Sequence, residues 1–202
     1  MEPKKIENRR DFLTKVIPLT TLACLGCKGA VSRQMAQGAN HKFSEKFGLT
    51  TEETYSFFYG LFIPVLQALS NEMGSEKFNS LFTRVSTENT AQMIAAMTKD
   101  LPKKDIEAFS SFMLDLLKTP PYNNVLTFEI VEQTDQVLEM KYTECLPAKL
   151  LRAMNAVDIG LALECSGAAA VAKAFNPKMS YSNPKNLMKG DSYCIERFTL
   201  KT

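Results

Sequence analysis

Three cysteines in the C-terminal half are the residues most capable of chemistry: Cys145, Cys165 and Cys194. Each is expected at a junction between secondary-structure elements, where a site can be assembled from distant parts of the chain. Cys145 directly precedes Leu146-Pro147, which is typical of a helix start, and the positive end of a helix lowers the pKa of a thiol placed there. We therefore expect a reactive thiolate at Cys145.

These sulfur atoms allow two chemical arrangements and one structural arrangement. Three thiolates could hold a zinc-like metal ion with an open fourth position for water, the layout of a metal-hydroxide hydrolase. One thiolate could instead act as a nucleophile beside an acid. Outside the cytoplasm, two of the three cysteines could form a disulfide and the third could be buried. No CxxC pair occurs among these three cysteines to favour the metal.

Carboxylates, rather than a histidine, are the expected acid–base partners of the cysteines. His41 is the only histidine, and it precedes the predicted folded body, where a solvated surface residue is expected. Glu144 and Glu164 each directly precede a cysteine. Asp191 is a candidate catalytic acid or a Gly-Asp turn residue, and Asp158 is a candidate helix cap.

The elements that must position these residues follow from hydrophobic periodicity. Thr50 and Glu53 form a capping box at the start of a helix. Pro64 should kink or break that helix. The small residues at 168–172 should let a later helix pack closely against a neighbour. Stretches in which apolar residues recur every three or four positions predict helices. Stretches in which apolar and polar residues alternate predict strands with one solvent-facing side. The helices are expected at about 51–73, 78–97 (faltering at 86–89), 103–117 and 146–174 (broken near 158–160). The strands are expected at 126–130, 138–142, 179–182 and 193–200. The predicted fold is α+β, with N-terminal helices and a four-stranded, mostly antiparallel sheet.

The N-terminus has the pattern of an export signal. Arg9-Arg10 is followed by Phe12-Leu13, then Lys15, then a short apolar segment over 16–26, which resembles a twin-arginine signal peptide. We therefore predict a signal peptide at 1–26, a tether at 27–48 and a single domain at 49–202. The predicted location is periplasmic.

A cysteine near the end of the signal predicts a lipid anchor. Cys27 follows Leu25-Gly26 and is the favoured lipidation site, with Cys24 as the alternative and cleavage near Ala30 to a soluble protein as a third. A membrane is then a partner only through this anchor or the signal peptide, because no apolar run approaches the roughly 20 residues of a spanning helix.

Composition limits the remaining partners. The chain has 202 residues, 45% of them hydrophobic, which is too apolar for a disordered chain. Its net charge is only +2, and most of the basic excess lies in the signal segment, so the folded body has no surplus with which to bind nucleic acid. A small-molecule substrate is expected.

The C-terminal half carries a family resemblance. Cys145-Leu146-Pro147, Cys165, Phe175-Asn176-Pro177 and the ending Gly190-Asp191-x-x-Cys194, in this order, resemble the L-2-amino-thiazoline-4-carboxylic acid hydrolase family. The resemblance implies ring-opening hydrolysis of a cyclic amidine or related C–N bond, by a cysteine–carboxylate set or a thiolate-bound metal. It also implies a fold similar to 4-vinyl reductase-type domains.

One departure from the family pattern supports an alternative. Family members tend to place an aspartate shortly after the second cysteine, whereas residues 166–170 here contain no acid. The alternative is a non-catalytic lipoprotein that binds a metal or small molecule on the same scaffold. A disulfide-bonded structural lipoprotein is the third hypothesis.

Overall fold

The computed structural model describes residues 48–201, and its residues from Thr50 onwards form one compact unit. The predicted signal peptide, the tether, His41 and both candidate lipidation sites lie outside the described residues. Within the described part, no helix combines the length and apolar character needed to cross a bilayer.

The N-terminal helices are α4 (Thr51–Met73), α5 (Ser75–Met97) and α6 (Ile106–Leu117). The predicted capping box is confirmed, because Thr50 Oγ1 accepts from the Glu53 N–H and the Glu53 carboxylate accepts from the Thr50 N–H. Pro64 lies inside α4, which continues past it. The predicted interruption of the second helix at 86–89 is wrong, since the Ser86 and Thr87 hydroxyls donate to backbone carbonyls and α5 packs along a later helix.

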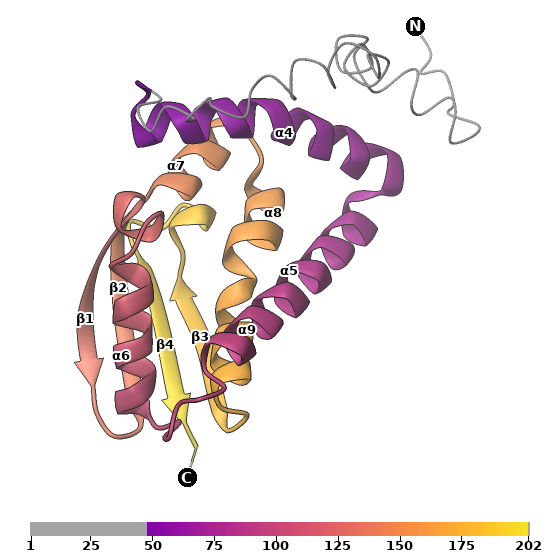
Figure 1. The fold of residues 1–202 in the computed structure, drawn as a ribbon. Coiled ribbons are helices and arrows are strands. Elements are labelled where there is room, and N and C mark those ends of the chain that lie inside the picture. Colours follow the sequence, from indigo (N-terminus) through magenta and orange to yellow (C-terminus); the bar gives the residue numbers. More distant parts are fainter. Residues whose placement is uncertain (1–47, 202) are drawn as a thin grey trace, which may run out of the picture. The chain divides into compact units, whose positions relative to one another are not determined.

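The strands form one antiparallel sheet in the order β1-β2-β4-β3 (Figure 1). The fold class predicted from the sequence is confirmed, with each strand extending to the following bounds: β1 (Leu126–Gln133), β2 (Val137–Cys145), β3 (Met179–Lys185) and β4 (Cys194–Leu200). One face carries half-buried charges, where Arg197 reaches both Glu132 and Glu139 at 2.6 Å. At one edge, β3 contains Pro184 and its pairing with β4 shifts register between Ser182 and Lys185.

The chain between the two strand pairs is helical but divided. It forms α7 (Leu146–Ala153), α8 (Val157–Gly160), the π-helical turn η2 (Leu161–Cys165) and α9 (Gly167–Phe175). The break lies at 154–156 rather than at the predicted 158–160, because Asn155 adopts the left-handed conformation with φ of 53°. Gly160 is helical, and its lack of a side chain lets Met188 approach the helix closely, since a Cβ at Gly160 would lie 2.6 Å from Met188 Sδ.

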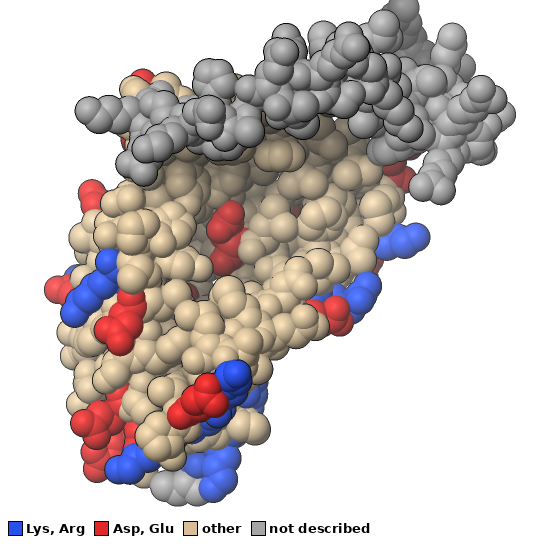
Figure 2. All heavy atoms as spheres, viewed as in Figure 1, with Lys and Arg blue, Asp and Glu red and all other residues tan. Residues whose placement is uncertain are grey.

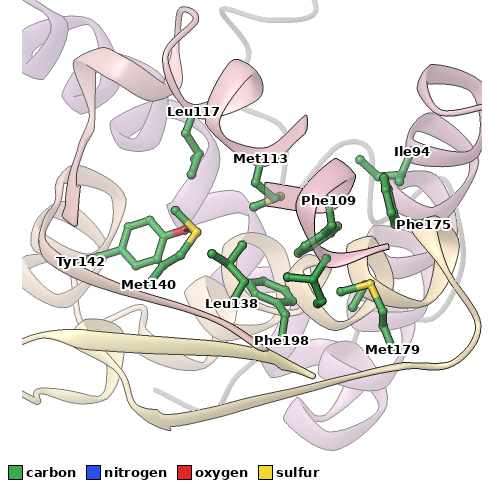
Figure 3. Close-up of a cluster of buried hydrophobic side chains, with 12 residues drawn as sticks. Ile94, Phe109, Met113, Leu117, Leu138, Met140, Tyr142, Phe175, Met179 and Phe198 are labelled. Carbon is green, nitrogen blue, oxygen red and sulfur yellow. Dashed lines mark hydrogen bonds between the residues drawn. The ribbon is translucent and has the colours of Figure 1, made fainter. Parts of the chain in front are cut away.

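Two clusters of buried side chains hold the unit together. The larger cluster lies between the sheet, α6 and α9, where Phe109 contacts both Phe175 and Phe198 edge-on or tilted (Figure 3). The predicted close packing of the alanine-rich helix is confirmed, because α9 packs against α5 and Ala172 is fully buried. The smaller cluster joins α4 and the start of α5 to α7 and α8, around Ile63 and Phe78. Cys194 packs against the larger cluster, and Cys145 and Cys165 pack against the smaller one.

Candidate active site

A cavity of about 330 Å³ lies between α5, α6, the sheet and the π-turn η2. Cys145, Cys165 and Cys194 all line it, so the structure brings together the three cysteines that the sequence singled out. Figure 2 shows acidic atoms within a hollow whose other visible surface is uncharged. The apolar wall comes from the helices and the sheet, and includes Met93, Ile94, Met113, Leu116, Leu117 and Phe198.

Cys145 occupies the predicted helix start, but its thiol is not activated there. It is the N-cap of α7, where its side chain makes no capping hydrogen bond, and the nearby Ala148 backbone N–H favours its thiolate. Burial has the larger effect and raises the pKa of Cys145 from an ordinary 9.0 to about 11. The expectation of a lowered pKa was therefore wrong, because desolvation of the thiolate outweighs the field of a helix only two turns long.

The other two thiols are also shifted toward the neutral form. Burial raises the pKa of Cys165 to about 12, which a hydrogen bond with Asn186 opposes. Burial raises the pKa of Cys194 more modestly, and the Leu187 N–H partly offsets this by donating to Cys194 Sγ over 3.0 Å. Of the three cysteines that line the cavity, Cys194 is therefore the one that loses its proton most readily.

All three cysteines are free thiols, which removes the predicted disulfide alternative from this structure. Within residues 48–201, no three His, Cys, Asp or Glu side chains come together in a way that could hold a metal ion. The shared cavity is lined by the three sulfur atoms without gathering them around one point. The donor set therefore does not fit the expected three-thiolate zinc-like site.

Glu196 is the site residue that the sequence analysis missed. It lies on β4 between the inward-facing Cys194 and Phe198, directly opposite Met140 on β2, and it lines the cavity. Burial raises the pKa of Glu196, and the hydrogen bond from the Tyr181 hydroxyl and the proximity of the Tyr142 hydroxyl oppose that rise. The Tyr142 hydroxyl itself donates to Met140 Sδ. The alternation of strand residues carried the signal, because a strand that buries Phe198 must also turn Glu196 inward.

The predicted carboxylates divide between the cavity and other positions. Glu164 lines the cavity and accepts from the Tyr59 hydroxyl of α4 at 2.8 Å. Glu144 lies outside it, bonded to the Thr127 hydroxyl on the neighbouring strand. Asp158 is in the first turn of α8, whose N-cap is Ala156, so the prediction that Asp158 caps a helix was wrong.

Asp191 lies beside the cavity and does not line it. Its carboxylate accepts from the Asn186 N–H at 2.7 Å, and its own N–H donates to the Asn186 carbonyl, which closes the turn around Gly190. Asn186 is buried, lines the cavity and bonds Cys165. Asp191 thus fixes a residue that contacts a site thiol.

A second, larger hollow adjoins the cavity. This groove has a volume of about 820 Å³ and is lined by the start of α7 and the ends of β1 and β2. Cys145 lines both hollows, so it forms part of the wall between them. The groove is lined by charges of both signs, those of Lys149 and Arg152 and those of Glu52 and Glu144, and Lys149 pairs with Glu52 at 2.8 Å.

Together, the residues that line the cavity include a possible proton carrier and a possible nucleophile. A carboxyl whose pKa is raised by burial can hold a proton and release it to a leaving group near neutral pH. Cys194, which lies two residues away on the same face of β4, supplies a sulfur atom. The fold and site thus define an α+β domain with a cavity lined by three cysteines and two glutamates.

The comparisons identify the family of this chain. Residues 54–198 match the family model of L-2-amino-thiazoline-4-carboxylic acid hydrolase, which spans most of the chain and all the cavity residues named above. The chain therefore belongs to this hydrolase family. A search of curated proteins found no significant match.

Two solved structures match part of this chain at low sequence identity. The phenol-responsive sensory domain of the transcription activator PoxR, solved with phenol, is 14% identical with a TM-score of 0.42, covering 68% of this chain and 71% of that one. An Fe(II) unliganded H-NOX protein from K. algicida is 17% identical with a TM-score of 0.38, covering 71% of this chain and 74% of that one.

Proposed function

We propose that this protein hydrolyses a non-peptide C–N bond of a small molecule, such as a cyclic amidine or thiazoline, in the cysteine-lined cavity. Membership of the hydrolase family supports the reaction class. The observation that carries the proposal is the position of Glu196, a carboxyl enclosed in the same cavity as the three thiols.

The proposed reaction uses Cys194 as nucleophile and Glu196 as proton carrier. The sulfur of Cys194 bonds to the amidine carbon while the thiol proton passes to the Glu196 carboxylate, which delivers it to the leaving nitrogen as the C–N bond breaks. Water then attacks the same carbon and gives a proton to Glu196. The C–S bond breaks, and Cys194 regains its proton.

The test is turnover of a thiazoline substrate by Cys194→Ala and Glu196→Gln. Each variant should lower kcat/KM by about a hundredfold or more, the range attributed to one acid–base group. Glu139→Gln is the matched control, because Glu139 pairs with Arg197 on the charged face of the sheet. Turnover within threefold of the unmodified protein in both cavity variants would rule out this mechanism.

A non-catalytic small-molecule-binding protein is the second candidate. Burial keeps the pKa of each site thiol above its ordinary value, which disfavours nucleophilic attack. No acid follows Cys165 in residues 166–170, where the family pattern expects one. A ligand that raises the Tm without being converted, in a preparation assayed over many hours, supports this candidate.

We further propose that the protein is exported by the twin-arginine route and anchored by a lipid on Cys27. The sequence of residues 9–27 supports this proposal. Arg9→Lys combined with Arg10→Lys should retain the protein in the cytoplasm, and Cys27→Ala should move the exported protein from the detergent phase to the aqueous phase. A shift caused by Cys24→Ala instead would assign the lipid to Cys24.

A further inference from the structure

The outer side of helix α4 carries a strip of exposed apolar side chains. This outer strip consists of Phe57, Phe58, Leu61, Phe62 and Val65, which are each 42–59% exposed and whose spacing places them on one side of the helix. Residues 54–71 contain no charged residue, so no charge interrupts the strip. Contiguous exposed apolar surface, unlike a scattered apolar residue, is typical of an interaction site.

The core of the domain uses the opposite, inner side of α4. Ile63 is buried in the smaller cluster, where Tyr59 and Leu66 pack against it. The Tyr59 hydroxyl also donates to Glu164 at 2.8 Å. Figure 1 shows the other described helices and the sheet on one side of α4. Because the inner side is already occupied by the domain, the outer strip is left for a partner outside it.

The segment that leads into α4 has a surplus of positive charge. Between the proposed lipidation site Cys27 and the start of α4, the sequence has four basic residues and one acidic residue: Lys28, Arg33, Lys42, Lys46 and Glu45. The two acids at the start of α4 are engaged with the protein, since Glu53 closes the capping box and Glu52 pairs with Lys149. An apolar helix face next to a basic segment is typical of proteins that bind anionic membrane surfaces.

The outer strip is small for an interface between two copies of the chain. Its three phenylalanines expose 50–59% of their surfaces, roughly 100 Å² each. With Leu61 and Val65 added, the strip remains below the roughly 800 Å² that each partner contributes to a protein interface of standard size. A bilayer sets no such minimum, because the strength of membrane binding scales with the apolar area that is inserted.

We propose that the outer strip of α4 inserts into the interface of a lipid bilayer with anionic headgroups, where it forms a second membrane contact beside the lipid on Cys27. The choice of a bilayer as the partner rests on the proposed lipid anchor, whereas the strip itself does not. Helix α4 then lies along the bilayer surface, because its inner side stays packed on the domain. Two linked contacts hold the domain at the membrane more tightly than either contact alone.

Tryptophan fluorescence tests the insertion directly, because the chain contains no tryptophan of its own. Phe62→Trp places one fluorophore in the strip, and Val131→Trp on β1 is the matched control, since Val131 is 53% exposed. Both are made in the full chain with Cys24→Ala and Cys27→Ala, so that no lipid is attached. Vesicles of phosphatidylglycerol and phosphatidylethanolamine should shift the emission of the Phe62→Trp protein to shorter wavelength, and lipids brominated in their acyl chains should quench it. The Val131→Trp protein should show neither effect.

Charged substitutions in the strip should weaken the response of the Phe62→Trp protein to vesicles. Phe58→Glu combined with Leu61→Glu should raise the lipid concentration at half of the maximal response at least about tenfold, because two apolar contacts are lost. Met97→Glu combined with Val131→Glu is the matched control, since these two residues are 52% and 53% exposed on α5 and β1. An unchanged response in the strip variant would overturn the inference.

The remaining outcomes separate this inference from the proposed lipid anchor. Emission of the Phe62→Trp protein at short wavelength without vesicles would show that protein, a second copy included, covers the strip, and would overturn the inference. If detergent partition assigns a lipid to Cys27 but brominated lipids do not quench the Phe62→Trp protein, the lipid anchor stands and the inference falls. If they quench it and no lipid is found on Cys27 or Cys24, the inference stands and the lipid anchor falls.

Discussion

The hydroxyl of Tyr181 on β3 donates a hydrogen bond of 3.1 Å to Glu196 on the neighbouring strand β4. This pair puts an ionisable group into a sheet face that otherwise packs a core. The Tyr142 hydroxyl lies near the same carboxyl and donates to Met140 Sδ. Burial raises the pKa of Glu196, and it also raises the pKa of both tyrosines, so the hydroxyls stay protonated as donors. The arrangement holds a carboxyl ready to exchange one proton.

Glu196→Gln should stabilise the protein at alkaline pH. The pKa of Glu196 is higher in the folded than in the unfolded state, so its contribution to stability is complete below the unfolded pKa and is lost as pH rises through the folded pKa. Glutamine does not titrate, so the Tm of the variant minus that of the unmodified protein should grow as the pH rises above the ordinary glutamate pKa of 4.5. Thermal scans at increasing pH provide the measurement. The exposed Glu107→Gln is the control, and a Tm difference that stays constant with pH would contradict the assignment.

The site thiols should react slowly in the folded protein. Burial raises the pKa of Cys145 by two units to about 11, so its thiolate fraction near pH 7.5 should be roughly a hundredfold smaller than that of an exposed thiol. Alkylation by iodoacetamide, followed for each cysteine by peptide mass spectrometry, should be slowest at Cys145 and Cys165 and faster at Cys194. The same reaction in guanidinium chloride is the control. Equal rates at Cys145 in the folded and denatured chains would disprove the raised pKa.

Asp191→Ala and Asp191→Asn distinguish a positioning role from a catalytic one. The alanine variant leaves the Asn186 N–H without its acceptor and should cost about 1.5–3 kcal/mol of unfolding free energy, the range for bonds to charged groups. The asparagine variant keeps an acceptor oxygen and should lose less than about 1 kcal/mol. Urea unfolding measures the cost, and turnover is assayed in parallel. Loss of turnover in a stable Asp191→Asn protein would instead make this carboxylate part of the chemistry.

Substitution of two phenylalanines compares the stability contribution of a core position with that of a surface position. Phe198→Ala empties a fully buried position between β4 and α6 and should destabilise the protein by about 3–5 kcal/mol. Phe62 on α4 is 58% exposed, and Phe62→Ala should change the unfolding free energy by less than about 0.5 kcal/mol. Chemical denaturation compares the two variants directly. Similar losses in both would show that the exposed face of α4 is covered in solution.

The sequence was sufficient for the elements whose signals are local. The Thr50–Glu53 capping box and the alternation along the strands depend on neighbouring residues, and both predicted the structure. Gly160 misled the prediction because its purpose is a contact with Met188, a residue 28 positions away that no local pattern reveals. Tertiary contacts likewise kept α5 continuous through polar residues.

The site was harder to predict because its electrostatics depend on burial. The sequence correctly predicted Cys145 at the start of a helix, but burial of the thiol raises its pKa, whereas a lowered pKa was expected. Glu196 could have been found by extending the alternation of β4 from Phe198. Its two tyrosine partners could not, since they come from strands on opposite sides of β4.

Pro184 has a consequence for how copies of this domain meet in concentrated solution. It lies in β3, an edge strand, next to the register shift between Ser182 and Lys185. An incoming strand needs a regular row of N–H donors, which a proline and an irregular register interrupt. Two further irregularities interrupt the opposite edge strand, β1. Both edge strands of the sheet therefore disfavour the edge-to-edge strand pairing that seeds amyloid-like aggregates.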